Sequence, residues 1–152
     1  MKNQNFTRTF SVDQSPQEVF AAINNPRGWW SQAIQGDTDR LGAEWKYQYG
    51  DVHRATMRVA ELTPGQKVVW HVVDNYFNFV KDAKEWTGTD VVFEITRKGG
   101  KTHVRFTHAG LVPSYECYDV CSKAWGSYVA GSLRDLIAKG KGRPNRSTNP
   151  RR

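Results

Sequence analysis

Hydrophobic residues change their spacing once along this chain, near Pro113. Before that point, apolar side chains recur at every second position in a series of segments, which is typical of strands with one buried face. After it, they recur at intervals of three and four residues up to Gly140, which is typical of one long amphipathic helix. The sheet must bury its apolar face, and this helix is the only large amphipathic partner for it. The order of elements therefore predicts an α+β fold.

Six segments before Pro113 carry the two-residue period of strands. They cover residues 6–13, 44–49, 54–59, 67–74, 89–97 and 102–109. Several of the connections are short and contain Gly or Pro, for example Lys98-Gly99-Gly100-Lys101. Short turns join antiparallel neighbours, whereas parallel strands need long crossovers. We therefore predict a curved antiparallel sheet of about six strands that wraps around the C-terminal helix.

A short helix is predicted directly after the first strand. Ser15 provides a capping side chain, Pro16 suits the first helical position, and Glu18 completes a capping box with Ser15. The Asn-Asn-Pro stretch at 24–26 ends this helix, because a residue that precedes proline disfavours helical geometry. Residues 27–30 are expected to form a loop or an irregular second helix.

The C-terminal helix is predicted to use Ser114 as its cap. Glu116 and Asp119 fall in its first turn, where the helix dipole favours negative charge. Gly140 is the expected stop, since glycine adopts the left-handed conformation that ends many helices. This helix would be about 25 residues long, or roughly 37 Å.

The net charge of +7 is concentrated near the C-terminus. Residues 139–152 hold six of the 22 lysines and arginines and no acidic residue, so the remainder of the chain is nearly neutral. The same stretch is rich in Gly, Pro, Ser and Asn, which indicates disorder. We predict one domain over residues 1–140 and a basic, disordered tail over 141–152. The tail could attract nucleic acid or anionic lipid weakly, but no specific nucleic-acid partner is expected.

No feature of the sequence indicates export or insertion into a membrane. The longest strongly apolar stretch, residues 68–73, is far shorter than the ~20 residues that span a bilayer. The N-terminus leads into no apolar segment of a signal peptide. Cys117 and Cys121, one helical turn apart, do not make a disulfide framework. The expected location is the cytoplasm.

Several short motifs resemble one known family. They are Ser15-Pro16-x-Glu18-Val19-Phe20, Asn25-Pro26 followed by Trp29-Trp30, Gly88-Thr89-Asp90, Gly100-Lys101-Thr102, Thr107-His108-x-Gly110-Leu111 and Trp125-x3-Val129-x3-Leu133. With the order of elements, they make residues 6–142 similar to the activator-of-heat-shock-protein-ATPase homologue family of the START-like (SRPBCC, helix-grip) superfamily. That superfamily includes lipid carriers, hormone receptors, and polyketide aromatases and cyclases. The resemblance implies a helix-grip domain, often with a cavity between sheet and helix.

Eleven residues on the inward-facing positions are candidates for the lining of such a cavity. They are Trp45, Tyr47, Tyr49, Met57, Val59, Phe93, Phe106, His108, Cys121, Trp125 and Tyr128. Aromatic walls with a few polar groups suit a small apolar ligand. The alternative is a core that these side chains fill completely, because protein interiors pack densely.

His108 is the candidate catalytic residue. It continues the inward face of its strand, so its imidazole could act as a general base or orient a ligand. The alternative is a structural histidine with hydrogen bonds to the protein. Cys117, Cys121 and His108 could together offer three metal ligands, but their spacing is a poor match to known zinc signatures and a fourth ligand is not obvious. Small buried hydrophobic side chains explain the cysteines better, and we expect no metal and no cofactor.

The connection at 75–88 is polar yet rich in aromatic side chains. Tyr76, Phe77, Phe79 and Trp86 are candidates for a lid over the pocket mouth. The same segment could instead bind a partner protein or extend the two flanking strands.

Three functions remain open on the sequence. The first is non-catalytic binding of a small hydrophobic molecule, such as a lipid, a sterol or an aromatic polyketide-like compound. The second is a cyclase or isomerase that uses His108 in the same cavity and needs no metal. The third is a protein-binding module, chaperone-linked in view of the family, which requires an exposed apolar patch outside any pocket. The oligomeric state is left open.

Overall fold

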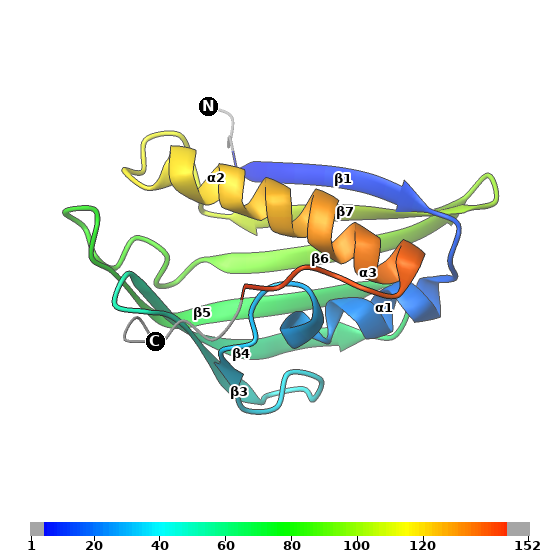
Figure 1. The fold of residues 1–152 in the computed structure, drawn as a ribbon, viewed down its shortest axis with the longest axis horizontal. Helices are drawn as coiled ribbons and strands as arrows, with labels where there is room; N and C mark the ends of the chain where they lie inside the picture. The colour runs from blue at the N-terminus through cyan, green and yellow to red at the C-terminus, as the bar shows by residue number, and fades with distance from the viewer. Residues whose placement is uncertain (1–4, 146–152) are drawn as a thin grey trace.

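A seven-stranded antiparallel sheet forms the body of the protein. The structure, a computed structural model, describes residues 5–145 (Figure 1). The strands are β1 (Phe6–Val12), β2 (Ile34–Gln35), β3 (Glu44–Tyr49), β4 (His53–Thr63), β5 (Lys67–Phe77), β6 (Asp90–Lys98) and β7 (Lys101–Ala109). They lie in the order β1-β7-β6-β5-β4-β3-β2, and every neighbouring pair is antiparallel. The predicted α+β fold is confirmed, with the two-residue β2 as the strand that the sequence did not indicate.

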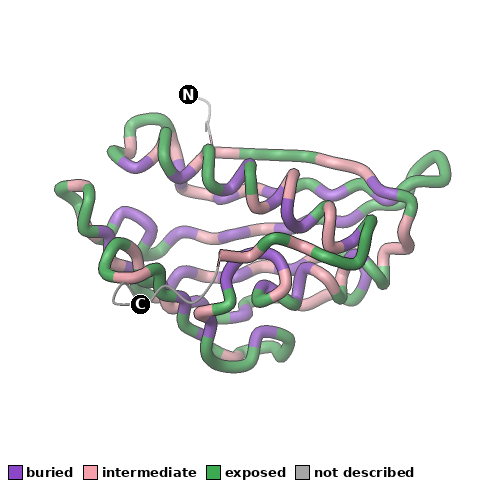
Figure 2. Tube along the Cα trace, in the orientation of Figure 1, coloured by how far each residue is buried: buried purple, intermediate pink, exposed green. Residues whose placement is uncertain are grey.

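One face of this curved sheet carries all the helices (Figure 1). The short helix α1 (Pro16–Ile23) contacts β5 and β6. A 3-10 turn (Pro26–Gly28) follows it, as the irregular second helix expected there. The long C-terminal helix runs without a break as α2 (Tyr118–Gly126), a π-helical segment (Ser127–Leu133) and α3 (Arg134–Lys139). Buried positions alternate with less buried ones along the strands (Figure 2).

The start of α1 is fixed by its own sequence. The Ser15 hydroxyl accepts a hydrogen bond from the Glu18 amide at 3.1 Å, and the Glu18 carboxylate accepts one from the Ser15 amide at 2.9 Å. This reciprocal pair is the predicted capping box, with Pro16 in the first turn. At the end of the C-terminal helix, Gly140 adopts the left-handed conformation with φ of 81°, as predicted.

The start of the C-terminal helix differs from the prediction. The helix begins at Tyr118, its N-cap is Cys117, and no side chain of the cap residue satisfies the first turn. Ser114 is therefore not the cap. The Glu85 carboxylate instead accepts hydrogen bonds from the backbone amides of Glu116 and Cys117, at 2.8 and 3.1 Å. A residue from the β5–β6 connection thus supplies the negative charge that a helix N-terminus favours.

The core between sheet and helices is dominated by tryptophan. The buried indoles are those of Trp29, Trp30, Trp45, Trp70, Trp86 and Trp125, which are all six in the chain. The Trp30 ring lies near the centre of this cluster, stacked on Tyr47 at 4.4 Å and tilted against Trp125 at 4.9 Å between ring centroids. Trp30 therefore fills the space between β3 and the C-terminal helix.

The last described residues, 141–145, return along the helix toward Trp30 (Figure 1). The Asn145 amide donates to the Trp30 carbonyl, and the Asn145 carbonyl accepts from the Gln32 amide, both at 2.9 Å. Its side chain accepts from the Ser31 hydroxyl at 2.5 Å and donates to the Tyr128 hydroxyl at 2.9 Å. Residues 141–145, expected to belong to a disordered tail, thus contact the domain. The rest of that predicted tail, 146–152, lies outside the described residues.

Candidate ligand-binding pocket

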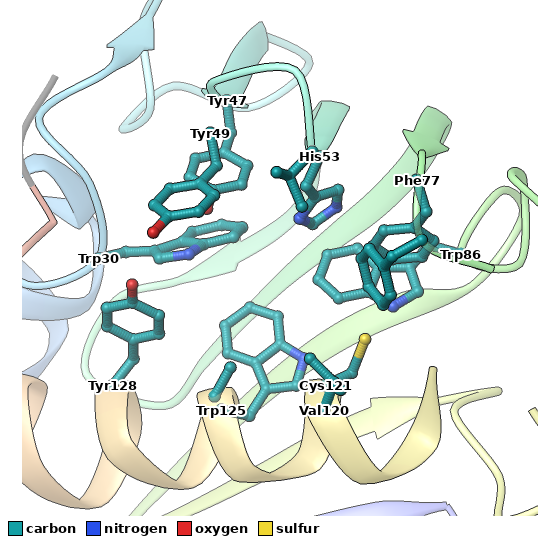
Figure 3. Close-up of a pocket in the computed structure, with 13 residues that line it drawn as sticks. Trp30, Tyr47, Tyr49, His53, Phe77, Trp86, Val120, Cys121, Trp125 and Tyr128 are labelled. Carbon is teal, nitrogen blue, oxygen red and sulfur yellow. The ribbon is translucent and has the colours of Figure 1, made fainter. Parts of the chain in front are cut away.

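A pocket of about 260 Å³ lies between the C-terminal helix and one end of the sheet (Figure 3). Residues from four regions meet there: the segment after α1, the ends of β3, β4 and β5, the β5–β6 connection, and the first half of the long helix. The lining residues are Trp30, Tyr47, Tyr49, Val52, His53, Phe77, Phe79, Trp86, Val120, Cys121, Ala124, Trp125 and Tyr128. Most of them carry aromatic rings, and no Asp, Glu, Lys or Arg is among them.

The rim of the pocket is apolar and exposed. Val120, Tyr49, Phe79 and Val52 have exposed fractions of 57, 42, 40 and 36%. Among the described residues, they are four of the five large hydrophobic side chains that are exposed, and Leu41 is the fifth. Clusters of exposed apolar side chains mark sites that bind ligands, membranes or other proteins. This cluster coincides with the mouth of the pocket.

Five of the eleven lining residues expected from the sequence do line this pocket. They are Tyr47, Tyr49, Cys121, Trp125 and Tyr128. The other six lie outside it, in the packed core: Trp45, Met57, Val59, Phe93, Phe106 and His108. Their inward direction was predicted correctly, but Trp29 and Trp30 cover much of that face of the sheet. The pocket is therefore confined to one end of the sheet.

Several lining residues were missed because they come from segments without a clear period. Trp30 follows a helix-breaking proline, and Val52 and His53 sit at the β3–β4 turn, where alternation along a strand says nothing about direction. The Trp29-Trp30 pair was a usable signal, since two adjacent tryptophans beside a short helix are costly to leave in water. Val120 and Ala124 share the helix face of Cys121, but they lie at its exposed edge.

His108 is fully buried and both of its ring nitrogens are occupied. The Trp125 indole N–H donates to Nδ1 at 3.0 Å, so Nε2 carries the proton of the neutral ring. Nε2 lies 2.7 Å from the Thr89 hydroxyl, which in turn donates to the Trp86 carbonyl at 2.6 Å. Burial lowers the pKa of His108 to about 3. No free nitrogen of His108 faces the pocket, so this arrangement gives the candidate catalytic role no support. His108 positions Trp125 and the β5–β6 connection instead.

His53, which the sequence did not single out, is the histidine of the pocket wall. Its ring extends from the start of β4 into the space between Tyr47 and Phe77 (Figure 3). The Nε2 atom is buried and has no hydrogen-bond partner in the described part of the chain. Burial, with the nearby His108, lowers its pKa to about 3, so the ring is neutral. A group with this pKa is a weak general base near neutral pH but remains a good hydrogen-bond partner.

Three of the four candidate lid residues line the pocket. Phe77 is the last residue of β5, while Phe79 and Trp86 belong to the connection that follows. Tyr76 points to the other side of the strand, where the Arg54 guanidinium lies over its ring at 4.8 Å. The alternative of an extension of both flanking strands holds for one of them, since β5 continues to Phe77 whereas β6 begins only at Asp90.

The two cysteines behave as small buried side chains. Cys117 is inaccessible to solvent, and Cys121 forms part of the pocket wall. The hydrogen bond with Cys121, together with burial, raises the pKa of the Cys117 thiol. A protonated thiol is a poor metal ligand and a poor nucleophile. Residues 5–145 contain no cluster of three or more His, Cys, Asp or Glu side chains placed to bind a metal ion.

Other proteins share this fold. With the dimeric Aha1 protein of Colwellia psychrerythraea the TM-score is 0.73 at 23% identity, over 91% of this chain and 98% of that one. With CalU16 of Micromonospora echinospora the TM-score is 0.65 at 18% identity, over 91% of this chain and 76% of that one. With DynU16, a putative protein in the dynemicin biosynthetic locus, it is 0.69 at 16% identity, over 95% of this chain but 51% of that one. These identities establish a shared fold only.

Comparisons of sequence place the chain in one family. No curated protein matches it. Among the helices of residues 5–145, none has the length and apolar character needed to cross a bilayer. Residues 13–138 match the family described as activator of Hsp90 ATPase homolog 1-like protein. Since this match covers most of the 152 residues, the chain belongs to that family.

Proposed function

We propose that the protein binds a small hydrophobic molecule in the pocket between the sheet and the C-terminal helix. The observation that carries this proposal is the lining, which is largely aromatic and contains no charged side chain. Ligand pockets have this character, with a few polar groups that fix orientation. The volume of about 260 Å³ lies just below the roughly 300–1,000 Å³ of pockets for drug-sized ligands. The ligand is therefore compact, which favours an aromatic compound over a sterol or a lipid.

The two other functions receive less support. A catalytic role would need a side chain that exchanges protons with the ligand, and the proposed base, His108, has both nitrogens engaged within the protein. A protein-binding module would need an apolar patch away from the pocket. In the described region, Leu41 is the one large exposed hydrophobic residue that does not line the pocket. Binding without catalysis is thus the simplest use of this site.

The first test is mass spectrometry of the protein as purified, under native conditions and after extraction with organic solvent. We expect an extra mass of one ligand per chain that is lost on extraction. A clean apo mass, combined with no thermal shift across a panel of aromatic compounds, sterols and lipids, contradicts the proposal.

A matched pair of variants locates the binding site. Ala124 lines the pocket on α2, whereas Ala138 is exposed on α3 and does not. Ala124→Trp places an indole at the pocket mouth and should weaken ligand binding at least tenfold. Ala138→Trp introduces the same side chain on the same long helix and should leave binding unchanged. Equal effects of the two substitutions contradict binding in this pocket.

A further inference from the structure

Two ring nitrogens in the pocket wall lack the hydrogen bonds that buried polar atoms normally make. They are Nε2 of His53 and Nε1 of Trp86, and both residues line the pocket. Their rings lie edge to face, with centroids 4.6 Å apart. Most buried polar groups in folded proteins have a partner, and leaving one unpaired is unfavourable. The indole nitrogens of Trp45 and Trp70 are also unpaired, but they lie in the packed core. Those of His53 and Trp86 belong to a pocket wall, where a ligand can supply the missing partner.

Three aromatic rings, those of Tyr47, Phe77 and Trp86, contact the His53 ring. This ring lies 4.4 Å from that of Phe77 and 5.2 Å from that of Tyr47, between centroids. His108 is buried in the same layer, yet its two nitrogens are both paired with protein groups. The two histidines differ in their hydrogen bonds because His108 faces the core and His53 faces the pocket. The Cβ–Cγ torsion of histidine is soft, so a small rotation of the ring aims a nitrogen at a ligand.

We propose that the ligand is an uncharged aromatic alcohol of the phenol class, whose hydroxyl group hydrogen-bonds to the His53 ring. This inference rests on the proposed function and names the chemistry of its ligand. A neutral imidazole has one nitrogen that donates and one that accepts. A hydroxyl group both donates and accepts, so it pairs with whichever nitrogen is presented. It also accepts from an indole N–H such as that of Trp86.

The other properties of the pocket select against charged and aliphatic alternatives. A carboxylate or an ammonium group in this pocket would lose its hydration without gaining a counter-ion from the lining. Planar rings find partners among the side chains that form the walls. The Trp30 and Tyr47 rings are stacked, and so are those of Trp86 and Trp125, at interplanar angles of 26° and 12°. A further flat ring extends such an arrangement in offset-stacked or edge-to-face geometry.

The test compares three probes of one shape: 2-naphthol, naphthalene and 2-naphthoate. Dissociation constants are measured by tryptophan fluorescence and by calorimetry at neutral pH for the wild-type protein, His53→Phe and the control His103→Phe. His103 is exposed on β7, away from the pocket. We expect the wild type and the control to bind 2-naphthol and to reject 2-naphthoate. In His53→Phe, the preference for 2-naphthol over naphthalene should fall about tenfold, which corresponds to about 1.4 kcal/mol.

A second measurement does not depend on the stability of a variant. The ring nitrogens of His53 are followed by NMR in the wild-type protein. Their resonances should shift on addition of 2-naphthol as a hydrogen bond forms, and much less on addition of naphthalene. Nitrogen shifts that are the same with both probes contradict the inference, whatever happens to His53→Phe.

The possible outcomes separate this inference from the proposed function. Equal binding of naphthol and naphthalene, with no effect of His53→Phe on their ratio, overturns the role of His53 but leaves a hydrophobic pocket in place. Preferred binding of 2-naphthoate overturns the uncharged class. If none of these probes binds and the wider panel also gives no thermal shift, the proposed function itself fails.

Discussion

The Glu85 carboxylate accepts a hydrogen bond from the backbone amide of Glu116 at 2.8 Å. The Glu116 carboxylate in turn accepts hydrogen bonds from backbone amides of the β5–β6 connection, which contains Glu85. Glu85 also accepts from the Cys117 amide. Glu116 accepts from the amides of Lys81 and Asp82, at 2.9 and 3.1 Å. The β5–β6 connection and the start of the long helix are therefore joined at the pocket by two carboxylates that point in opposite directions.

The two carboxylates should respond differently to the same substitution. In Glu85, each oxygen accepts from a different amide, so Glu85→Gln sets a side-chain N–H₂ against a backbone N–H and should lower the free energy of unfolding by about 1–3 kcal/mol. In Glu116, one oxygen accepts both bonds, and glutamine retains that oxygen. Glu116→Gln should therefore have little effect. Urea denaturation measures both, with Glu94→Gln, at an exposed site on β6, as the control. Equal losses from the two variants would show that the pairing is not as described.

The series of hydrogen bonds that joins Trp125, His108 and Thr89 should contribute to the stability of the fold rather than to a catalytic step. Thr89→Val removes the hydroxyl that lies between His108 and the Trp86 carbonyl. It leaves Nε2 of His108 without this partner, whereas the Trp86 carbonyl keeps its hydrogen bond from the backbone amide of residue 89. We expect a loss of about 1–3 kcal/mol in the free energy of unfolding. Thr107→Val, on the neighbouring strand, removes a partly exposed hydroxyl and should cost less than about 0.5 kcal/mol. Combining Thr89→Val with His108→Phe should cost less than the sum of the single losses, since both remove the same bond. If the two losses in the free energy of unfolding are strictly additive, Thr89 and His108 do not share this hydrogen bond.

Stability should fall as the pH is lowered below about 6.5. In the unfolded chain a histidine has a pKa near 6.5, whereas burial lowers that of His108 to about 3. The unfolded state therefore takes up a proton that the folded state does not. The free energy of unfolding should decrease by about 1.4 kcal/mol for each pH unit between these values. His53, whose pKa is lowered to about 3 by burial and by His108, adds a slope of the same sign.

Urea denaturation at a series of pH values between 7 and 5 measures this slope. The lowered carboxyl pKa values of Asp13, Asp74 and Asp135 act below this range, because their ordinary value is 3.8. His108→Gln should reduce the slope by about 1.4 kcal/mol per pH unit, whatever its effect on stability at pH 7. A slope that does not change in this variant would mean that His108 is not buried in the neutral form.

Asn145 should support the pocket from outside. Its side chain connects the Ser31 hydroxyl to the Tyr128 hydroxyl, and both Trp30 and Tyr128 line the pocket. Asn145→Ala removes two hydrogen bonds, so the free energy of unfolding should fall by about 1–2 kcal/mol. Ligand affinity should fall with it, because the Tyr128 ring loses a contact that fixes its position. Asn78→Ala, at an exposed site, is the control. Affinity that is unchanged at lower stability would separate the segment 141–145 from the site.

Local rules predicted much of the fold. The capping box at Ser15 and the stop at Gly140 depend on atoms within a few residues of each other, so the sequence contains all the information needed. The same logic was wrong at Ser114, because Glu85, about thirty positions away along the chain, takes the place of a local cap. The candidate site was predicted in part for a related reason. Alternation gives the direction of a side chain on a strand, but not whether another residue, such as Trp30, covers it.

The sequence by itself determined the α+β class, the order of the elements apart from β2, and the inward faces, because periodicity, turns and caps are local properties of the chain. Its short motifs indicated the family by resemblance. Only the tertiary structure decided which histidine faces the pocket. His53 and His108 lie on different strands of one curved sheet. Trp86, from the β5–β6 connection, packs against Trp125 and closes off His108, while His53 stays at the pocket wall. That outcome depends on contacts between residues far apart in the chain, which no local pattern records.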